Sequence, residues 1–369
     1  MKKIRFLMIG GFLGAGKTTT IAKIAGHYAQ AGLSVGLVTN DQAYDLVDTH
    51  TLRSQGFTVG EVPGACFCCK FDDLIKTVSD LSDETLPDLV IAEPVGSCTD
   101  LYATVIQPMK QMFGDRFELG PLVVLLKPEH GRKILARSDG QKRRGFSPQA
   151  EYIFLKQLEE ADAIAINKID KLSEDAVQEL VAAVSSRFEA TPCVGFSARE
   201  GTDFERFIEL VETQHHRQRS AMDVDYETYA AGEAELGWLN CQVDAAADEK
   251  FPLDDVVLAL VKSVGEQLTD AGFETAHLKV LGQTIENAAV ANLVSSGEAA
   301  ELSLASEIKT TAAELLVNAR VAADPDKLVE SVKTACQRVG QTQGIKLTVS
   351  NIQSFRPAKP EPTHRVQGD

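Results

Sequence analysis

The sequence predicts an α/β fold, in which a mostly parallel sheet is flanked by helices, followed by a smaller α+β domain. From Ile4 to about Leu210, short apolar runs alternate with longer amphipathic stretches, as in parallel sheets that carry helices on both faces. Several of these runs are apolar almost throughout, which is expected of strands buried on both faces. Further along the chain, one order of strand, helix and strand occurs twice.

Seven strands are predicted in the first part of the chain. The 369 residues exceed the size at which a single hydrophobic core stops growing, so two domains are expected. The polar segment 215–235 places the boundary near residue 222. We expect an α/β domain over 1–222, a duplicated β-α-β domain of ferredoxin-like type over 223–355 and a disordered tail over 356–369. The predicted strands are 4–9, 34–39, 57–62, 89–92, 122–126, 163–166 and 193–196, then 238–243, 275–281, 314–321 and 345–355.

A phosphate-binding loop follows the first predicted strand. Residues 11–18 fit the pattern G-x-x-x-x-G-K-[ST] and precede a helix-like stretch. Glycines let backbone N–H groups surround phosphates, and the helix N-terminus adds its dipole. Lys17 is predicted to contact the β and γ phosphates as a catalytic residue, and the Thr18 hydroxyl to bind magnesium. The predicted phosphate-contacting residues are Gly11, Gly14, Ala15, Gly16, Lys17, Thr18 and Thr19.

A guanine-binding motif follows the sixth predicted strand. Asn167, Lys168 and Asp170 lie at the carboxyl end of this strand, where open α/β sheets bind nucleotides. The Asp170 carboxylate can accept hydrogen bonds from guanine N1 and N2, whereas adenine presents an acceptor at N1. Ser197 and Ala198 resemble the short motif that supports the base through a backbone N–H. We therefore predict a P-loop protein that prefers GTP to ATP.

Acidic residues at strand ends are candidates for magnesium and for nucleotide-dependent switches. Glu93 follows the fourth predicted strand and is expected to hold magnesium as a catalytic carboxylate, while Gly96 would contact the γ-phosphate. Asn40 and Asp41 end the second strand and form a candidate first switch. The predicted magnesium ligands are Thr18, Glu93 and Asp41, although Asp45 and Asp48 remain alternatives to Asp41.

Three of the seven cysteines lie together in one loop, at Cys66, Cys68 and Cys69. Thiolates select zinc, copper(I), cobalt or nickel over magnesium. Three sulfurs leave a fourth tetrahedral position open, which suits a transferable ion. A redox-sensitive group of thiols is the alternative. Of the scattered cysteines 98, 193, 241 and 336, burial as small apolar side chains is expected for the last three.

Taken in order, the P-loop, Cys-x-Cys-Cys, Glu-x-x-Gly and Asn-Lys-x-Asp motifs resemble the CobW/HypB/UreG family of metallocenter-assembly GTPases. The resemblance covers about residues 4–215, and the cysteine motif is most similar to the CobW-like branch. It implies a slow, magnesium-dependent GTPase that delivers a transition metal, or a metal cofactor, to a client protein. It also implies that Cys66, Cys68 and Cys69 bind that metal, with zinc as the first expectation and cobalt or nickel as alternatives.

Composition restricts the partners. A net charge of −16 disfavours nucleic acid, whose binding depends on clustered Lys and Arg. With neither a long apolar run nor a cleavable leader pattern, we expect a cytoplasmic protein without a membrane partner. GTP or GDP, a client protein and a nucleotide-dependent homodimer are the expected partners. A GTP-gated regulatory scaffold that carries no metal is the alternative function, and a kinase-like phosphotransferase would leave the guanine motif and cysteine loop unused.

Overall fold

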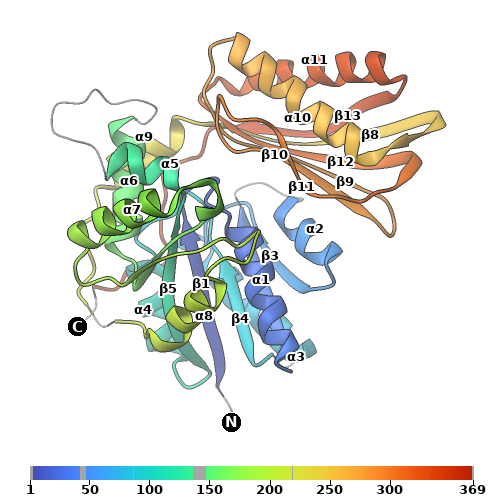
Figure 1. Ribbon diagram of the computed structural model, residues 1–369. Coiled ribbons are helices and arrows are strands. Elements are labelled where there is room, and N and C mark those ends of the chain that lie inside the picture. The colour runs from blue at the N-terminus through green and yellow to red at the C-terminus, as the bar shows by residue number, and fades with distance from the viewer. Residues whose placement is uncertain (1–2, 42–46, 86, 136–146, 218, 368–369) are drawn as a thin grey trace. The chain divides into compact units, whose positions relative to one another are not determined.

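The computed structural model describes residues 3–41, 47–85, 87–135, 147–217 and 219–367 (Figure 1). These residues form two compact units. The first contains residues 1–42, 57–232 and 359–369, and the second contains 43–56 and 233–358. The boundary was expected near residue 222, and the structure divides the chain at Gly232 instead. Two short segments also differ from the expectation, since 43–56 groups with the second unit and 359–369 with the first.

The first unit is built on a seven-stranded sheet in the order β3-β2-β4-β1-β5-β6-β7. Each neighbouring pair is parallel. The most apolar runs form central strands, and all four residues of β6 are buried, as expected where helices cover both faces. The strands are β1 (Ile4–Gly11), β2 (Val35–Asp41), β3 (Thr58–Pro63), β4 (Leu89–Glu93), β5 (Phe117–Leu126), β6 (Ala163–Ile166) and β7 (Cys193–Gly195).

Helices connect these strands, as the α/β prediction requires. Two of them have serine caps: Ser147 accepts a hydrogen bond from Ala150 N at the start of α6, and Ser173 accepts one from Ala176 N at the start of α7. The helices are α1 (Lys17–Gln30), α3 (Phe71–Thr85), α4 (Gln107–Phe113), α5 (Pro128–Ile134), α6 (Pro148–Glu159), α7 (Glu174–Arg187), α8 (Phe204–Thr213) and α9 (Tyr226–Ala234), with a π-helix, η1 (Tyr102–Ile106), and a 3-10 turn, η2 (Ile169–Lys171).

The second unit has a six-stranded antiparallel sheet in the order β11-β10-β9-β12-β8-β13. Its four strands β9, β12, β8 and β13, with helices α10 and α11, have the order of a ferredoxin-like fold, as predicted. The prediction missed the two strands β10 and β11. The elements are α2 (Val47–Ser54), β8 (Gly237–Pro252), α10 (Leu253–Asp270), β9 (Thr275–Gln283), β10 (Ala288–Leu293), β11 (Glu301–Leu304), β12 (Lys309–Val321), α11 (Pro325–Gln343) and β13 (Lys346–Phe355).

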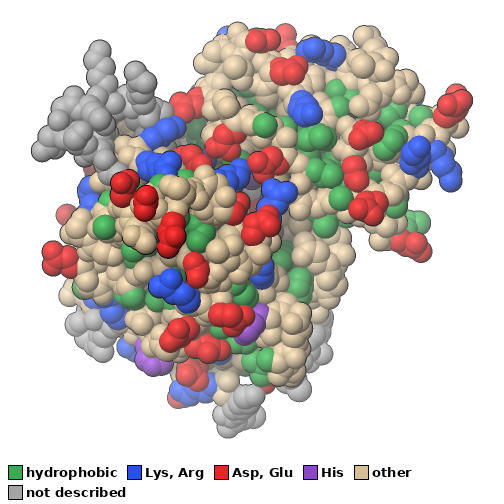
Figure 2. Space-filling model, in the orientation of Figure 1, with side chains coloured by type: hydrophobic (Ala, Val, Ile, Leu, Met, Phe, Trp, Pro, Cys, Tyr) green, Lys and Arg blue, Asp and Glu red, His purple; other side chains and the backbone are tan. Residues whose placement is uncertain are grey.

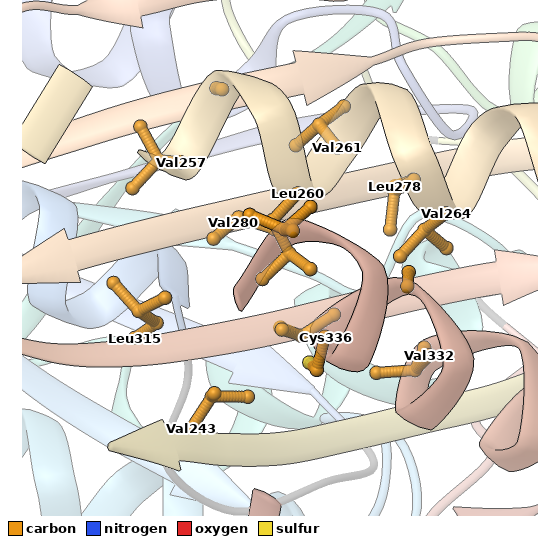
Figure 3. Packing of buried hydrophobic residues seen from close by; sticks show 14 of the residues in the cluster. Val243, Val257, Leu260, Val261, Val264, Leu278, Val280, Leu315, Val332 and Cys336 are labelled. Atoms are coloured by element: carbon orange, nitrogen blue, oxygen red, sulfur yellow. The ribbon is translucent and has the colours of Figure 1, made fainter. Parts of the chain in front are cut away.

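The core of the second unit lies between its sheet and its two long helices. Buried residues of α10 recur at helical spacing, as in Val257, Val261 and Val264, so one stripe of the helix is apolar. Figure 3 shows these side chains packed against Val280 of β9 and Val332 of α11. The unit therefore contains its own core, which supports its treatment as a separate domain.

On the face drawn in Figure 2, acidic and basic side chains are interspersed. Within the described residues, no helix is both long enough and apolar enough to cross a membrane.

Candidate functional site

The phosphate loop needs glycine at two of its positions. Gly11 ends β1 with φ +132°, and a Cβ there would lie 2.4 Å from the backbone oxygen of Leu125. Gly16, with φ +90°, precedes helix α1, and its Cβ would lie 2.5 Å from Nδ2 of Asn167. A side chain at either position would require the backbone or the guanine motif to shift. The loop is therefore built to bring its backbone close to neighbouring groups.

Lys17 lies beside Gly96, the residue predicted to contact the γ-phosphate. Its Nζ donates a hydrogen bond to the Gly11 carbonyl at 3.1 Å. A Cβ on Gly96 would lie 3.1 Å from the same Nζ, so the Gly96 backbone approaches the Lys17 amine closely. Ala15 is buried, whereas Thr19 is exposed in the first turn of α1. The structure thus brings the P-loop and Gly96 together.

Two predicted magnesium ligands are in contact. The Thr18 hydroxyl donates a hydrogen bond to Oε1 of Glu93 at 3.2 Å, and Glu93 is buried at the end of β4. Hydroxyl and carboxylate oxygens are hard donors of the kind that magnesium prefers, so this pair fits the cation. Asp45 and the side chain of Asp41 lie outside the described residues. Asp48 forms an ion pair with Lys279 within the second unit.

Asn167 connects the guanine motif to the phosphate loop. Its Nδ2 donates to the Ala15 carbonyl at 2.9 Å. Its Oδ1 accepts from the backbone N–H groups of Lys168 at 2.8 Å and Ala198 at 3.0 Å. The side chain is almost fully buried, so all three bonds form away from water. Asn167 therefore holds three nucleotide-binding segments in one arrangement.

Asp170 and Ser197 are also brought together. The Ser197 hydroxyl donates a 2.6 Å hydrogen bond to Oδ1 of Asp170 and accepts one from the Glu200 backbone N–H. Lys168 adopts φ +65° just before the 3-10 turn that carries Asp170. Because Ser197 holds one carboxylate oxygen, the orientation of Asp170 is fixed before a base binds. The Asp170 carboxylate, held in this way, can accept hydrogen bonds from the donor groups of guanine.

Asn40, part of the candidate first switch, contacts the cysteine loop. Its Nδ2 donates hydrogen bonds to the carbonyls of Val62 and Ala65, both at 2.7 Å, and its Oδ1 accepts from the Phe67 backbone N–H. These contacts hold the ends of the cysteine loop at the end of β2. Asn40 therefore helps to hold the loop that carries the thiol cluster.

The three clustered cysteines converge on one point. The Sγ atom of Cys66 lies 2.7 Å from that of Cys68 and 3.4 Å from that of Cys69, and the Cys68 and Cys69 sulfurs are 3.7 Å apart. Among the described residues, these three cysteines are the group of three or more Asp, Glu, His or Cys side chains that could hold a metal ion, and their sulfurs all lie within 4.8 Å of one another. Cys66 and Cys68 are buried and Cys69 is half-buried. The donor set is therefore soft and partly shielded from water.

Hydrogen bonding among the thiols moves their pKa values apart. Bonds from Cys68, then Cys69 and Cys98, hold the pKa of Cys66 well below its ordinary value. The same contacts, together with burial, raise the pKa of Cys68, and the Cys66 neighbour raises that of Cys69 to about 12. Cys66 is consequently the first thiolate of the cluster, and a cation would be needed to stabilise the second and third.

The segment 359–367 packs against the cysteine loop, although the sequence predicted disorder there. The backbone N–H of Glu361 donates to Sγ of Cys69 at 3.3 Å, and that of Thr363 to the Cys68 carbonyl at 2.8 Å. The Thr363 hydroxyl donates to the Cys69 carbonyl at 3.0 Å. These bonds order the segment and cover the outer side of the loop.

Sequence reasoning also missed the surroundings of Cys98. This residue lies two positions after Gly96, and its buried thiol contributes to the pKa shifts of Cys66 and Cys68. Gln157 Nε2 donates to the carbonyls of Gly96 at 3.0 Å and Cys98 at 2.8 Å. One available signal was that both cysteine segments follow strands of one parallel sheet, so their side chains emerge at the same edge.

A sequence model of the CobW/HypB/UreG nucleotide-binding domain matches residues 5–193. A zinc chaperone CobW from Sinorhizobium sp. is 29% identical over 213 residues, covering 52% of this chain and 58% of that protein. A zinc chaperone YeiR from Escherichia coli K12 is 27% identical over 180 residues, covering 47% of this chain and 49% of that protein. The chain therefore spans about half the length of these relatives.

Solved structures give matches at lower identity. HypB from Helicobacter pylori in complex with nickel is 19% identical, with 59% of this chain and 92% of that chain covered and a TM-score of 0.42. Zn(II)-bound YjiA GTPase from E. coli is 15% identical, with 91% and 99% covered and a TM-score of 0.39. The family model covers more than half of the 369 residues and includes the phosphate loop, the cysteine motif and the guanine motif. This chain belongs to the CobW/HypB/UreG family.

Proposed function

We propose that this protein is a GTPase that binds zinc at Cys66, Cys68 and Cys69 and delivers it to a client protein. The convergence of these three thiols supports the proposal most strongly. Their loop follows a strand of the same parallel sheet whose strand ends carry the phosphate loop and the guanine motif. Nucleotide and metal would therefore bind at one edge of one sheet.

The nucleotide half of the proposal rests on charge and hydrogen-bond polarity. Lys17 would compensate phosphate charge, and Asp170 would accept the two guanine donors. Thr18 and Glu93 would hold magnesium with GTP, and the cation would neutralise charge on the transferred phosphoryl group. Asp41 remains a proposed ligand at the end of β2. Gly96 lies beside Lys17, which supports the proposal that its N–H contacts the γ-phosphate.

The choice of zinc rests on ligand chemistry. Thiolates favour zinc over magnesium, and cobalt(II) and nickel(II) are the alternatives that the same donors accept. The names of the two curated relatives support zinc as the first choice. Free thiols also favour a reducing compartment, so we propose that transfer occurs in the cytoplasm. The second unit, which has its own core, would recognise the client.

Binding of the two ligands should be coupled. A γ-phosphate that orders Gly96 would act on the segment that continues to Cys98, whose thiol contacts Cys66 and Cys68. If GTP tightens zinc binding, linkage requires zinc to tighten GTP binding by the same factor, typically about 5- to 150-fold. Hydrolysis would then weaken the hold on zinc and allow its transfer.

Zinc affinity measured against a chromophoric chelator tests this function, with a GTP analogue, with GDP and without nucleotide. We expect one zinc per chain, tighter binding with the GTP analogue, and loss of binding when all three cysteines of the loop are replaced by serine. Cys336→Ser is the matched control, because Cys336 is buried in the core of the second unit. Retained zinc in the triple variant would contradict the site.

A protein that binds and hydrolyses GTP but takes up no zinc, cobalt or nickel would instead be a nucleotide-gated scaffold. Metal uptake in the same titration distinguishes the two functions. Equal zinc affinity in all three nucleotide states would contradict the coupling and leave metal binding itself intact.

A further inference from the structure

The surroundings of the thiol cluster contain a fourth sulfur. Cys98 is 1% exposed, and its buried thiol is close enough to those of Cys66 and Cys68 to shift the pKa of both, although it lies outside the group of sulfurs that are all within 4.8 Å of one another. It comes from a different part of the chain, the segment after β4, whereas the other three follow β3. The four sulfurs thus approach one another from two loops of one sheet.

The position of Cys98 is determined by several hydrogen bonds. Its N–H donates to the Val95 carbonyl at 2.9 Å, and its carbonyl accepts from Gln157 at 2.8 Å. The next residue, Thr99, donates through its hydroxyl to Glu160 at 3.2 Å, and Glu160 also accepts from the Tyr102 N–H. The Cys98 backbone is therefore held on both sides, which orients its thiol toward the cluster.

We propose that Cys98 is the fourth zinc ligand, which completes a tetrahedral site of four sulfurs with Cys66, Cys68 and Cys69. This inference rests on the proposed function, since it assumes that the three-cysteine loop binds zinc. It assigns the coordination position that the Cys-x-Cys-Cys motif leaves open.

Metal binding would require a defined rearrangement of the sulfurs. Thiolates about 2.3 Å from a tetrahedral zinc lie roughly 3.8 Å from one another. The Cys66 and Cys68 sulfurs, now 2.7 Å apart, would separate by roughly 1 Å. Cys98 lies outside the group whose sulfurs are all within 4.8 Å, so Cys69 and Cys98 would draw closer around the ion. Cys69 is half-buried, whereas Cys66, Cys68 and Cys98 are buried, so Cys69 can supply this movement.

The fourth ligand would connect the metal to the nucleotide through covalent bonds. Only Ser97 separates Cys98 from Gly96, and Gly96 lies against the Lys17 amine. A displacement of the Gly96 backbone by a γ-phosphate would therefore change the distance from the Cys98 sulfur to the ion. A site with three sulfurs holds zinc more weakly than one with four, so loss of this single bond would favour release.

The experiment counts sulfur ligands in the full-length protein. X-ray absorption of the zinc-loaded protein, and the visible spectrum of the cobalt-loaded protein, both report the number of metal–sulfur bonds. We expect four in the wild type with a GTP analogue and three in Cys98→Ala. Zinc affinity in Cys98→Ala should fall by at least about 10- to 100-fold, the loss typical of residues that merely support a ligand.

Cys193→Ala is the matched control. Burial alone raises the pKa of the Cys193 thiol, to about 12, which marks a cysteine outside the cluster. This control should keep four sulfurs and wild-type zinc affinity. Cys98→Ser retains the side-chain volume, so its circular dichroism and unfolding temperature show whether loss of zinc reflects loss of folding.

Three sulfurs in the wild type, or equal sulfur counts in the wild type and Cys98→Ala, would overturn the assignment of Cys98. In either case, zinc lost from the triple serine variant would leave the proposed function standing. A wild type that binds no metal would overturn both.

Discussion

Replacement of Asn167 by alanine tests whether one buried side chain organises the nucleotide site. Asn167→Ala removes three hydrogen bonds, to Ala15 O, Lys168 N and Ala198 N. Each contributes roughly 0.5–1.5 kcal/mol, so the total is about 3 kcal/mol. If only the bond to the phosphate loop affects binding, a loss of about 1 kcal/mol should lower GTP affinity about 5-fold, and if all three do, the affinity should fall about 150-fold.

The measurement is a titration with fluorescent GTP and GDP, together with thermal unfolding. Both nucleotides should bind more weakly, whereas the preference for GTP over ATP should persist because Asp170 is intact. Asn318→Ala is the matched control, because Asn318 is also buried and hydrogen-bonds to Asn240 in the second unit. It should lower the unfolding temperature without changing GTP affinity. An Asn167→Ala protein that binds GTP within about threefold of the wild type would refute the reasoning.

Further predictions concern phosphate charge, base choice, loop geometry and pH. Lys17→Ala should abolish GTP turnover, a loss of about 3 kcal/mol or more of transition-state stabilisation, while its circular dichroism stays unchanged. Asp170→Asn should shift binding from GTP toward xanthosine triphosphate in competition assays, because it reverses one hydrogen-bond polarity. Gly11→Ala should abolish nucleotide binding, since its Cβ would lie 2.4 Å from the Leu125 oxygen; normal GTP affinity would contradict this steric argument. Burial raises the pKa of Glu160 from 4.5 to about 8, so the folded state retains a proton that the unfolded state releases, and the unfolding free energy should decrease as pH rises through this window. Glu160→Gln should flatten that dependence in denaturant titrations at pH 5 to 8, and an unchanged slope would assign it to other groups.

The sheet of the first unit could be predicted because its strands are short apolar runs at regular spacing. The guanine and phosphate motifs were predictable for a related reason, since each is a contiguous set of residues at a strand end. The structure brings them together through Asn167, whose contact with Ala15 joins residues 152 positions apart. No local pattern specifies such a bond, although the motifs imply that the two loops meet.

The second unit shows where local patterns fail. Strand β10 has the sequence Ala-Ala-Val-Ala-Asn-Leu, and its Ala and Asn residues have low strand propensity. Strand β11 has four residues at the edge of the sheet, too few for a clear alternation. Pairing of β10 with β9, and of β11 with β10, therefore decides these strands, and the residues within each strand do not specify it.

The residues that surround the thiols also could not be predicted from composition. Three prolines and several charged residues made the segment after residue 355 resemble a disordered tail, but its backbone N–H groups find acceptors on the cysteine loop. The contacts of Asn40 with the cysteine loop could not be predicted for a similar reason, because its partners lie 22 to 27 positions further along the chain. Cys98 was left aside because it stands alone in the sequence.

The contact between Thr363 and Cys69 has a consequence for synthesis of the protein. The two residues are 294 positions apart in the chain. At about 5–20 residues per second, a ribosome needs roughly 15 to 60 s to pass from one to the other. During that interval the nascent chain already has its cysteine loop but lacks the residues that cover it. The thiols would then be open to oxidants and to competing metal ions, so cells that make this protein under oxidative or copper stress would risk damaging it before it is complete.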